Sequence, residues 1–256
     1  MPRDNWLAPI PERVGALNAR YRHHAAVSVL EHALRDREVG RVALVSSFGA
    51  ESVVLLHMIS VMAPATPVIF IDTRMLFEET LAYQRALAQR LELRDLRVIR
   101  AHESALAAHD PDGLLHRNDP DACCALRKSA PLEGALAGFD AWITGRKRFQ
   151  GATRAHLDFF EAEDNALRIK INPLAHWDRG DVADYIENNG LPRHPLVARG
   201  YPSIGCAPCT APVREGEDPR AGRWPGQDKT ECGIHFADGQ VVRVAQTAMT
   251  QEEDAA

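Results

Sequence analysis

The sequence contains no uninterrupted apolar run long enough to cross a bilayer, which argues against a membrane-spanning helix. Its first residues, MPRDNWLAPIPER, mix both charges with three prolines and have no apolar middle of the kind found in a secretory signal. Basic excess is missing as well, because 30 Lys and Arg face 35 Asp and Glu in 256 residues. We therefore expect a soluble cytoplasmic protein, with neither membrane nor nucleic acid as its partner.

Cysteine is scarce, with five residues in the whole chain. In a reducing compartment, so few cysteines favour metal binding or catalysis over structural disulfides. The odd number leaves at least one thiol unpaired under any pairing scheme. There is no internal repeat, and the length fits one α/β domain carrying an irregular appendage. The sequence does not distinguish a monomer from a homo-oligomer.

Short apolar runs alternate with helical spacing along the first two thirds of the chain. Predicted strands are Arg41–Val45, Val68–Asp72, Leu96–Arg100, Ala141–Thr144 and Arg168–Ile171. Predicted helices are Val14–Val39, Glu51–Val61, Phe77–Leu93 and Asp178–Asn188. This alternation predicts a parallel sheet with helices on both faces, and a ligand beyond the carboxyl ends of its strands. The turns Ser46–Gly49 and Asp72–Thr73 should line one crevice.

Prolines and glycines are frequent after Asn188, so this part should be rich in loops and needs a cross-link to hold its shape. The acidic end of the chain is typical of a frayed tail. The expected division is an N-terminal helical segment (1–40), an α/β domain (41–200), a cysteine-containing loop segment (201–236) and a flexible tail (237–256).

Four cysteines form two close pairs far apart in sequence, the tandem Cys123-Cys124 and the CxxC pair Cys206 and Cys209. Two such pairs can supply four thiolates to one tetrahedral or cubane site. A structural zinc site is the main alternative, although zinc knuckles usually space both pairs by two to four residues. A redox disulfide is less favoured, because the strand–CxxC–helix context is missing. The spacing favours an iron–sulfur site.

The fifth cysteine, Cys232, stands in the run ECGIHF among polar and glycine neighbours. One interpretation is an exposed cysteine without a role. The other is a nucleophile, since the positive charges of Lys229 and His235 favour a thiolate. A nucleophile near a chain end can also alternate between a closed site and an outside reductant.

Residues suited to anions gather after the predicted strands. Ser46–Ser52 joins a strand to a helix, where backbone N–H groups bind phosphate or sulfate oxygens, although it lacks the GxxxxGK[ST] frame of a Walker A loop. Further candidates are Lys128, Gly145, Arg146, Arg154, Arg220 and Arg223. By contrast, His102, His109, His116 and His176 lack ligand spacing and are interpreted as surface or packing residues. Asp158, Glu161, Glu163 and Asp164 are interpreted as a solvated turn.

An ordered set of motifs resembles a known family. CCALRK (123–128) with Pro131-Leu132, then AWITGR (141–146), YPSIGCAPCT (201–210) and ECGIH (231–235) are similar to assimilatory adenylyl-sulfate (APS) reductases, which belong with the phosphoadenylyl-sulfate (PAPS) reductases. The resemblance runs from about Ser46 to His235.

The resemblance implies an adenine nucleotide alpha hydrolase-like sheet, with 41–200 as the nucleotide-binding domain and 201–236 as the cluster-binding and catalytic segment. It implies a [4Fe–4S] cluster on Cys123, Cys124, Cys206 and Cys209, and a nucleophile at Cys232. PAPS reductases typically lack both cysteine pairs, so the pairs point to adenylyl sulfate. A PAPS reductase or a dual APS/PAPS enzyme is the alternative. The family often has Asp-Thr-Gly after the second strand, whereas this chain has Arg74.

The expected reaction is the thioredoxin-dependent reduction of adenylyl sulfate to sulfite and AMP, in assimilatory sulfate reduction and cysteine biosynthesis. We expect the nucleotide to lie across Ser47, Gly49 and Asp72. Its sulfate would be held by Lys128, Arg146, Arg154, Arg220 and Arg223. Cys232 attacks the sulfur atom, AMP leaves, and thioredoxin or a similar dithiol releases sulfite.

Two rivals belong to other classes. An ATP-dependent tRNA sulfur-insertion enzyme on the same fold would need an SGGxDS-type loop, which is absent, and usually a basic surface. A non-catalytic, zinc-stapled nucleotide-binding module would share the cysteine pairs, and iron and acid-labile sulfide analysis separates it from a reductase.

Overall fold

The computed structural model describes residues 7–163, 167–226 and 229, and these form a six-stranded sheet in the order β3-β2-β1-β4-β6-β5. Five strands are parallel, and β5 runs antiparallel to β6. The strands are β1 (Val42–Val45), β2 (Val68–Ile71), β3 (Leu96–Ile99), β4 (Ala141–Ile143), β5 (Phe160–Ala162) and β6 (Ile169–Ile171). The predicted strands and the predicted mostly parallel sheet are confirmed.

Strand β5 was not predicted, and the expected solvated turn is wrong for Glu161 and Glu163. Asp158 is exposed as expected, and Asp164 lies outside the described residues. Glu161 lies within β5, where its carboxylate accepts a hydrogen bond from Asn172 at 2.8 Å. Glu163 accepts from Arg168 Nε at 2.8 Å. Acidic residues are depleted in strands, and β5, with three residues, is too short to show an alternating pattern. The tertiary ion pairs, not the local sequence, explain its acidic composition.

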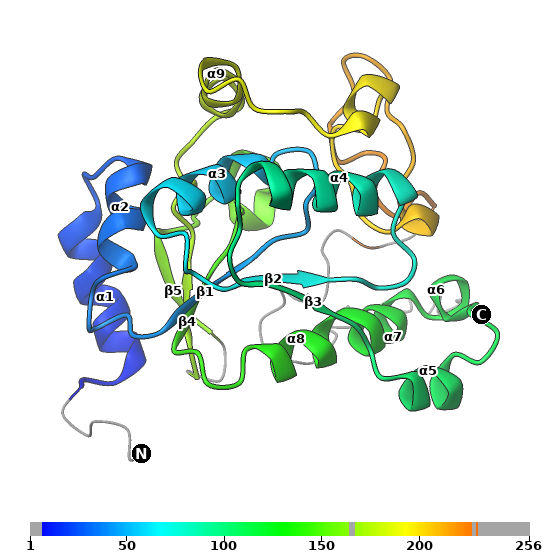
Figure 1. Cartoon of the computed structure of the whole chain (residues 1–256), viewed down its shortest axis with the longest axis horizontal. Helices are drawn as coiled ribbons and strands as arrows, with labels where there is room; N and C mark the ends of the chain where they lie inside the picture. Colours follow the sequence, from blue (N-terminus) through cyan, green and yellow to red (C-terminus); the bar gives the residue numbers. More distant parts are fainter. Residues whose placement is uncertain (1–6, 164–166, 227–228, 230–256) are drawn as a thin grey trace, which may run out of the picture.

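Helices cover both faces of the sheet (Figure 1). They are α1 (Ile10–Tyr21), α2 (Ala26–Ala33), α3 (Val53–Met62), α4 (Glu78–Arg90), α5 (Glu103–His109), α6 (Leu115–Asn118), α7 (Pro120–Cys124), α8 (Ala130–Ala135) and α9 (Arg179–Asn188). A π-helical turn, Ala125–Ser129, joins α7 to α8. Short 3₁₀ turns are Arg148–Gln150, Ala152–Arg154, Pro195–Arg199 and Ala207–Cys209.

The single helix predicted over Val14–Val39 is wrong, because the chain breaks between α1 and α2. The ring of Tyr21, at the end of α1, stacks on His32 of α2 with centroids 5.5 Å apart. It also meets His24 in the intervening turn edge-on at 5.3 Å. Folding α2 back onto α1 therefore buries this ring, a gain that one continuous helix cannot provide.

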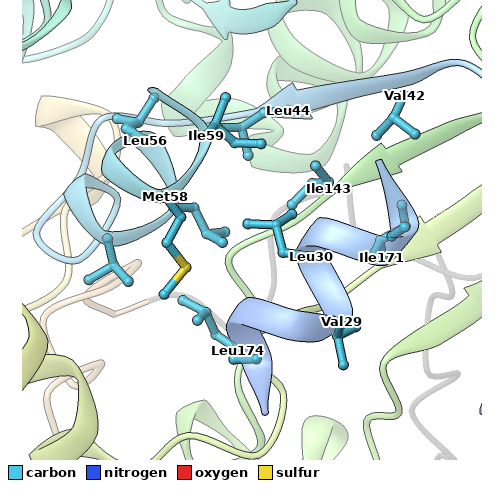
Figure 2. Close-up of a cluster of buried hydrophobic side chains, with 14 of the residues drawn as sticks. Val29, Leu30, Val42, Leu44, Leu56, Met58, Ile59, Ile143, Ile171 and Leu174 are labelled. Atoms are coloured by element: carbon cyan, nitrogen blue, oxygen red, sulfur yellow. The ribbon is translucent and has the colours of Figure 1, made fainter. Parts of the chain in front are cut away.

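The side chains of each strand alternate between two cores, as the pleat of a strand requires. Val42 and Leu44 of β1 enter the larger core with α1–α4, while Ala43 enters the smaller one with Leu132 of α8 and Trp142 of β4. In Figure 2 the larger core is seen where α2 and α3 meet the sheet. Its labelled residues are Val29, Leu30, Val42, Leu44, Leu56, Met58, Ile59, Ile143, Ile171 and Leu174. Helices on both faces thus hold the strand ends rigidly in place.

Helix α1 protects the outer edge of β5 with an asparagine. Asn18 Nδ2 donates to Phe160 O at 2.8 Å, and Phe160 N–H donates to Asn18 Oδ1 at 2.9 Å. Because Phe160 is buried, an Asn18→Ala variant leaves two backbone groups without these partners, and its free energy of unfolding should fall by about 2 kcal/mol. Urea unfolding checks this, with the exposed Asn188→Ala as the matched control. Equal losses in both variants would contradict the edge-capping role.

The segment from Tyr201 to Gly226 has little regular structure and docks against the turn after β2. Ala207 N–H donates to Met75 O at 2.8 Å, and isolated bridges pair Leu76 with Cys206 and Thr210 with Arg223. The predicted loop-rich C-terminal segment is confirmed within these residues. In the described residues, no helix has the length and apolar character that spanning a membrane requires.

Candidate active site

A cavity of about 260 Å³ opens beyond the carboxyl ends of β1 and β4. These two strands are neighbours, yet the chain leaves β1 toward β2 on one side and returns to β4 on the other. This is the switch point at which open α/β sheets bind ligands. Loops after both strands line the cavity, together with residues 202–206, 218–220 and 223–224 of the C-terminal segment.

The loop after β1 is anchored by a residue in an unusual backbone conformation. Phe48 has a φ of 49°, and its fully buried ring packs edge-on against Phe70 of β2 at 5.2 Å. Beside it, Gly49 N–H donates to Ser52 Oγ at 3.0 Å. A Cβ on Gly49 would lie 3.3 Å from Ser47 Oγ, so a larger residue at this position would crowd the loop that lines the cavity. Left-handed non-glycine residues persist where the surrounding structure determines them, often at functional sites.

Arg146, just after β4, is held by a polar network from three strands. Its guanidinium pairs with Glu161 of β5 and donates to Asn172 Oδ1 at 3.2 Å. Thr144 Oγ1 donates to the same Asn172 oxygen at 2.6 Å. Arg146 therefore lines the cavity with its charge already balanced by Glu161.

Lys147 is buried more deeply than its neighbours, with 2% of its side chain exposed. Its Nζ donates to Glu51 Oε2 at 2.7 Å and to Gly145 O at 3.0 Å. Burial lowers the pKa of Lys147, and Glu51 opposes that effect. This ion pair joins the loop after β1 to the loop after β4.

The C-terminal segment adds two arginines to the cavity, both over the ring of Trp224. Arg223 Cζ lies 4.5 Å and Arg220 Cζ 5.8 Å from the ring centroid. Cation–π contacts of this kind help to orient a guanidinium. A Cβ on Gly205 would lie 2.4 Å from Arg223 Nη2, so the missing side chain of Gly205 makes room for this arginine.

The four cysteines of the two pairs border a second, smaller pocket. All four are buried, with between 6% and 9% of each residue exposed. Burial raises the pKa of the Cys123 thiol to about 11, against the opposing effect of Arg127. Cys206 Sγ lies 3.2 Å from Thr73 Oγ1. In the described part of the chain, no group of three or more histidine, cysteine, aspartate or glutamate side chains is arranged to hold a metal ion.

A buried ion pair frames this cysteine pocket. Arg127 Nη2 donates to Asp110 Oδ2 at 2.6 Å, and its Nη1 donates to Thr73 O at 3.0 Å. Asp110 also accepts from Leu115 N–H at 2.8 Å, at the start of α6. Burial acts to raise the pKa of Asp110, but the hydrogen bonds from Arg127 and Leu115 outweigh it, so the pKa is lowered. The pair thus ties α6, the turn after β2 and the segment after Cys124 together.

Most of the predicted site residues meet at these two pockets. The large cavity is lined by Ser47, Gly49, Lys128, Gly145, Arg146, Arg154, Arg220 and Arg223, and the small one by Cys123, Cys124, Cys206 and Cys209. Asp72 is not brought to the cavity: its carboxylate accepts from Arg74 N–H at 2.9 Å and Arg100 Nε at 2.8 Å, while its neighbour Thr73 lines the wall. Cys232 lies outside the described residues.

Several residues of these pockets were not predicted from the sequence. His116, interpreted as a surface or packing residue, lines the cysteine pocket, and that interpretation is incomplete. Lys147 was not among the candidates, and Glu51 was covered only by the range Ser46–Ser52. Arg127 could have been predicted as a pocket residue from its position between Cys124 and Lys128.

Arg74, which replaces the usual family glycine, adopts a φ of 60°. An Arg74→Gly variant should be more stable than Arg74→Ala by about 1 kcal/mol, because glycine adopts this conformation without steric cost. Both variants remove the exposed ion pair with Glu103, so comparing their urea unfolding isolates the backbone effect. Equal stabilities would show that the turn is not strained.

Comparisons with known proteins agree with this geometry. Residues 41–212 match the family model described as the phosphoadenosine phosphosulfate reductase domain. The chain is 50% identical over 232 residues to the adenosine 5'-phosphosulfate reductase of Mesorhizobium japonicum, covering 91% of each chain. It is 41% identical over 216 residues to the protein of the same name from Bacillus cereus, covering 82% of this chain and 90% of that one.

A solved structure of phosphoadenylyl-sulfate (PAPS) reductase from Candida auris matches with a TM-score of 0.68 and 30% identity, over 78% of this chain and 97% of that chain. An FMN adenylyltransferase from Candida glabrata, 16% identical with a TM-score of 0.52, shares the fold alone. The family model and the reductases among the relatives thus show an α/β enzyme of the oxidoreductase class. The chain belongs to the phosphoadenosine phosphosulfate reductase family, and its resemblance to adenylyl-sulfate reductases is confirmed.

Proposed function

We propose that this protein reduces adenylyl sulfate to sulfite and AMP in sulfate assimilation, through an S-sulfo intermediate on Cys232 and with thioredoxin or a similar dithiol as reductant. The names of its relatives support the substrate. The proposal includes a location in the cytoplasm, and it holds for a monomer and for a homo-oligomer alike. In the described residues, no helix could span a membrane.

One observation carries the proposal: the large cavity and the cysteine pocket share a wall. Thr73, Lys128 and Cys206 line both. An anion held against this wall would lie beside Lys128, in a cavity that Arg154 and Arg223 also line. Adenylyl sulfate suits such a site, because its phosphosulfate group concentrates negative charge at one end of a molecule whose other end is a largely apolar adenine ring.

The chemistry of the cysteine pocket fits an iron–sulfur cluster, because such a cluster takes its thiolates on several iron atoms and they need not converge on a single ion. Four buried thiols from two segments are the donor set that [4Fe–4S] clusters use, and ligation as thiolates offsets the cost of burying them. Cys123 and Cys124 come from α7, and Cys206 and Cys209 come from the loop segment. Ligation by both pairs would cross-link the loop segment to α7 and so hold its shape. We assign the cluster a structural and electrostatic role, because the thiols account for both electrons.

The proposed chemistry is two displacements at sulfur. The Cys232 thiolate forms a bond to the sulfonyl sulfur while the bond from that sulfur to the bridging oxygen breaks, and AMP leaves with the electron pair. A dithiol then attacks the Cys232 sulfur, and sulfite leaves with the electrons of the S–S bond. The second thiol of the reductant resolves the mixed disulfide, so the dithiol is oxidised and Cys232 is restored.

Positive side chains around the sulfate lower the cost of both charge movements. Lys128, Arg154, Arg220 and Arg223 line the cavity and face a group whose negative charge moves onto the leaving phosphate. Arg146 also lines the cavity, and its guanidinium is paired with Glu161. Ser47 and Gly49 place hydroxyl and backbone groups at the end of β1, where phosphate binding is favoured.

An anaerobic assay tests the proposal. Iron-replete protein is incubated with thioredoxin and either adenylyl sulfate or its 3'-phosphorylated form, and sulfite is followed. We expect sulfite from adenylyl sulfate. Sulfite from the 3'-phosphorylated nucleotide alone would assign the alternative PAPS reductase activity, equal rates would assign a dual enzyme, and no sulfite from either would overturn the proposal.

A further inference from the structure

A chain of hydrogen bonds runs along the wall of the cavity, from the loop after β1 to the turn that carries Arg154. Glu51 Oε2, which pairs with Lys147 Nζ, also accepts from Gln150 Nε2 at 3.1 Å. Gln150 Oε1 in turn accepts from Lys147 N–H at 3.1 Å and from Arg154 Nη1 at 2.5 Å. All four residues line the cavity, and Lys147 and Arg154 are buried. Glu51 therefore reaches Arg154 through one intervening side chain.

The carboxylate of Glu51 and the N–H of Lys147 together fix the orientation of the Gln150 amide. An ionised carboxylate only accepts, so Gln150 must turn its NH₂ group toward Glu51 and its oxygen toward Arg154. A neutral amide at position 51 would donate as well as accept, so only Lys147 N–H and Arg154 itself would then require the Gln150 oxygen on their side. Because an amide binds the Gln150 NH₂ group more weakly than a carboxylate does, Gln150 and the guanidinium bound to it would be held less firmly.

We propose that Glu51 is a positioning residue that orients the Arg154 guanidinium through Gln150 and so adapts the cavity to the sulfate end of the nucleotide. This inference rests on the proposed function, in which Arg154 faces the sulfate. Glu51 acts without touching that sulfate itself. Its loss should therefore affect the two ends of the nucleotide unequally.

Binding of two nucleotides separates this role from a general structural one. In iron-replete protein carrying Cys232→Ser, so that adenylyl sulfate is not consumed, the Kd values of AMP and adenylyl sulfate are measured by calorimetry. Glu51→Gln should weaken adenylyl sulfate binding about tenfold and AMP binding much less, as expected for coupled neighbours. Glu187→Gln, on the exposed side of α9, is the control with the same charge change and should alter neither Kd.

Exchanging the two side chains gives the sharpest test. In the double variant E51Q/Q150E the carboxylate moves to position 150, where it again accepts from Arg154, while the amide at position 51 donates to it and accepts from Lys147. Adenylyl sulfate affinity should return to within about twofold of the parent, a non-additive result that independent sites do not give.

Three results would overturn the inference. One is an equal loss of AMP and adenylyl sulfate affinity in Glu51→Gln, and a second is unchanged affinity for both. The third is a double variant no better than Glu51→Gln. If instead the Cys232→Ser parent bound neither nucleotide, the proposed function would fail and this inference with it.

Discussion

A Cys232→Ser variant is expected to lose sulfite production by roughly four orders of magnitude, the loss seen when an enzyme's nucleophile is removed. A serine hydroxyl has a much higher pKa than a thiol, and a sulfonate bound through a serine oxygen could not be released as sulfite by a dithiol, because it has no S–S bond to accept the dithiol's electrons. The variant should keep its iron, its brown colour and its affinity for AMP, because the four other cysteines and the cavity are unchanged. A sulfite assay with thioredoxin, run beside metal analysis, measures both properties.

The matched control is a substitution in the cysteine pocket. Cys209→Ser removes one proposed iron ligand, so it should lower iron content, in contrast to Cys232→Ser. If Cys232→Ser also lost its iron, Cys232 would be a ligand and not the nucleophile. Turnover at the wild-type rate in Cys232→Ser would reject the assignment altogether.

An Asp110→Ala variant should lose about 3–5 kcal/mol of stability, the cost of leaving one member of a buried ion pair alone. Its partner Arg127 has 7% of its side chain exposed and donates to Asp110 at 2.6 Å. The same change removes the acceptor for Leu115 N–H at the start of α6. Urea unfolding measures the loss, and few single substitutions in this chain should exceed it.

A double variant separates the charge effect from simple cavity formation. D110A/R127M removes both charges, so it should recover more than half of the stability lost in Asp110→Ala. The exposed pair Arg35 and Glu31 supplies the control, since Glu31→Ala should change stability by less than about 1 kcal/mol. If the double variant were less stable than Asp110→Ala, an unpaired Arg127 charge would not be the cause.

The fold was predictable where burial on both faces gives continuous apolar runs. Val68–Ile71 and Ala141–Ile143 are buried parallel strands of this kind, and their ends locate the cavity. The antiparallel β5 was missed because its stability comes from Asn18 and β6, which are distant in sequence. The break after Tyr21 was missed for the same reason, since ring stacking onto α2 outweighs a helical pattern.

The site was predictable where chemistry restricts residue type. Paired cysteines and clustered arginines stand out in a sequence with net negative charge, and the structure brings them to adjoining pockets. Glu51 and Asp110 did not stand out, because a lone acid in a loop resembles any solvated residue. Only the fold reveals that each faces a buried cation. Asp72 shows the converse. Its place at a strand end predicted a site residue, but its carboxylate pairs with Arg100 and does not line the cavity.

The central claim is that Cys232 carries the sulfonate group between two displacements. Mass spectrometry of iron-replete protein, exposed to adenylyl sulfate without a reductant and then digested, tests it directly. The account predicts one added sulfonate on the peptide that contains Cys232, one AMP released per adduct, and loss of the adduct as sulfite when thioredoxin is added. Release of AMP with an unmodified Cys232, or with the sulfonate on another residue, would contradict it.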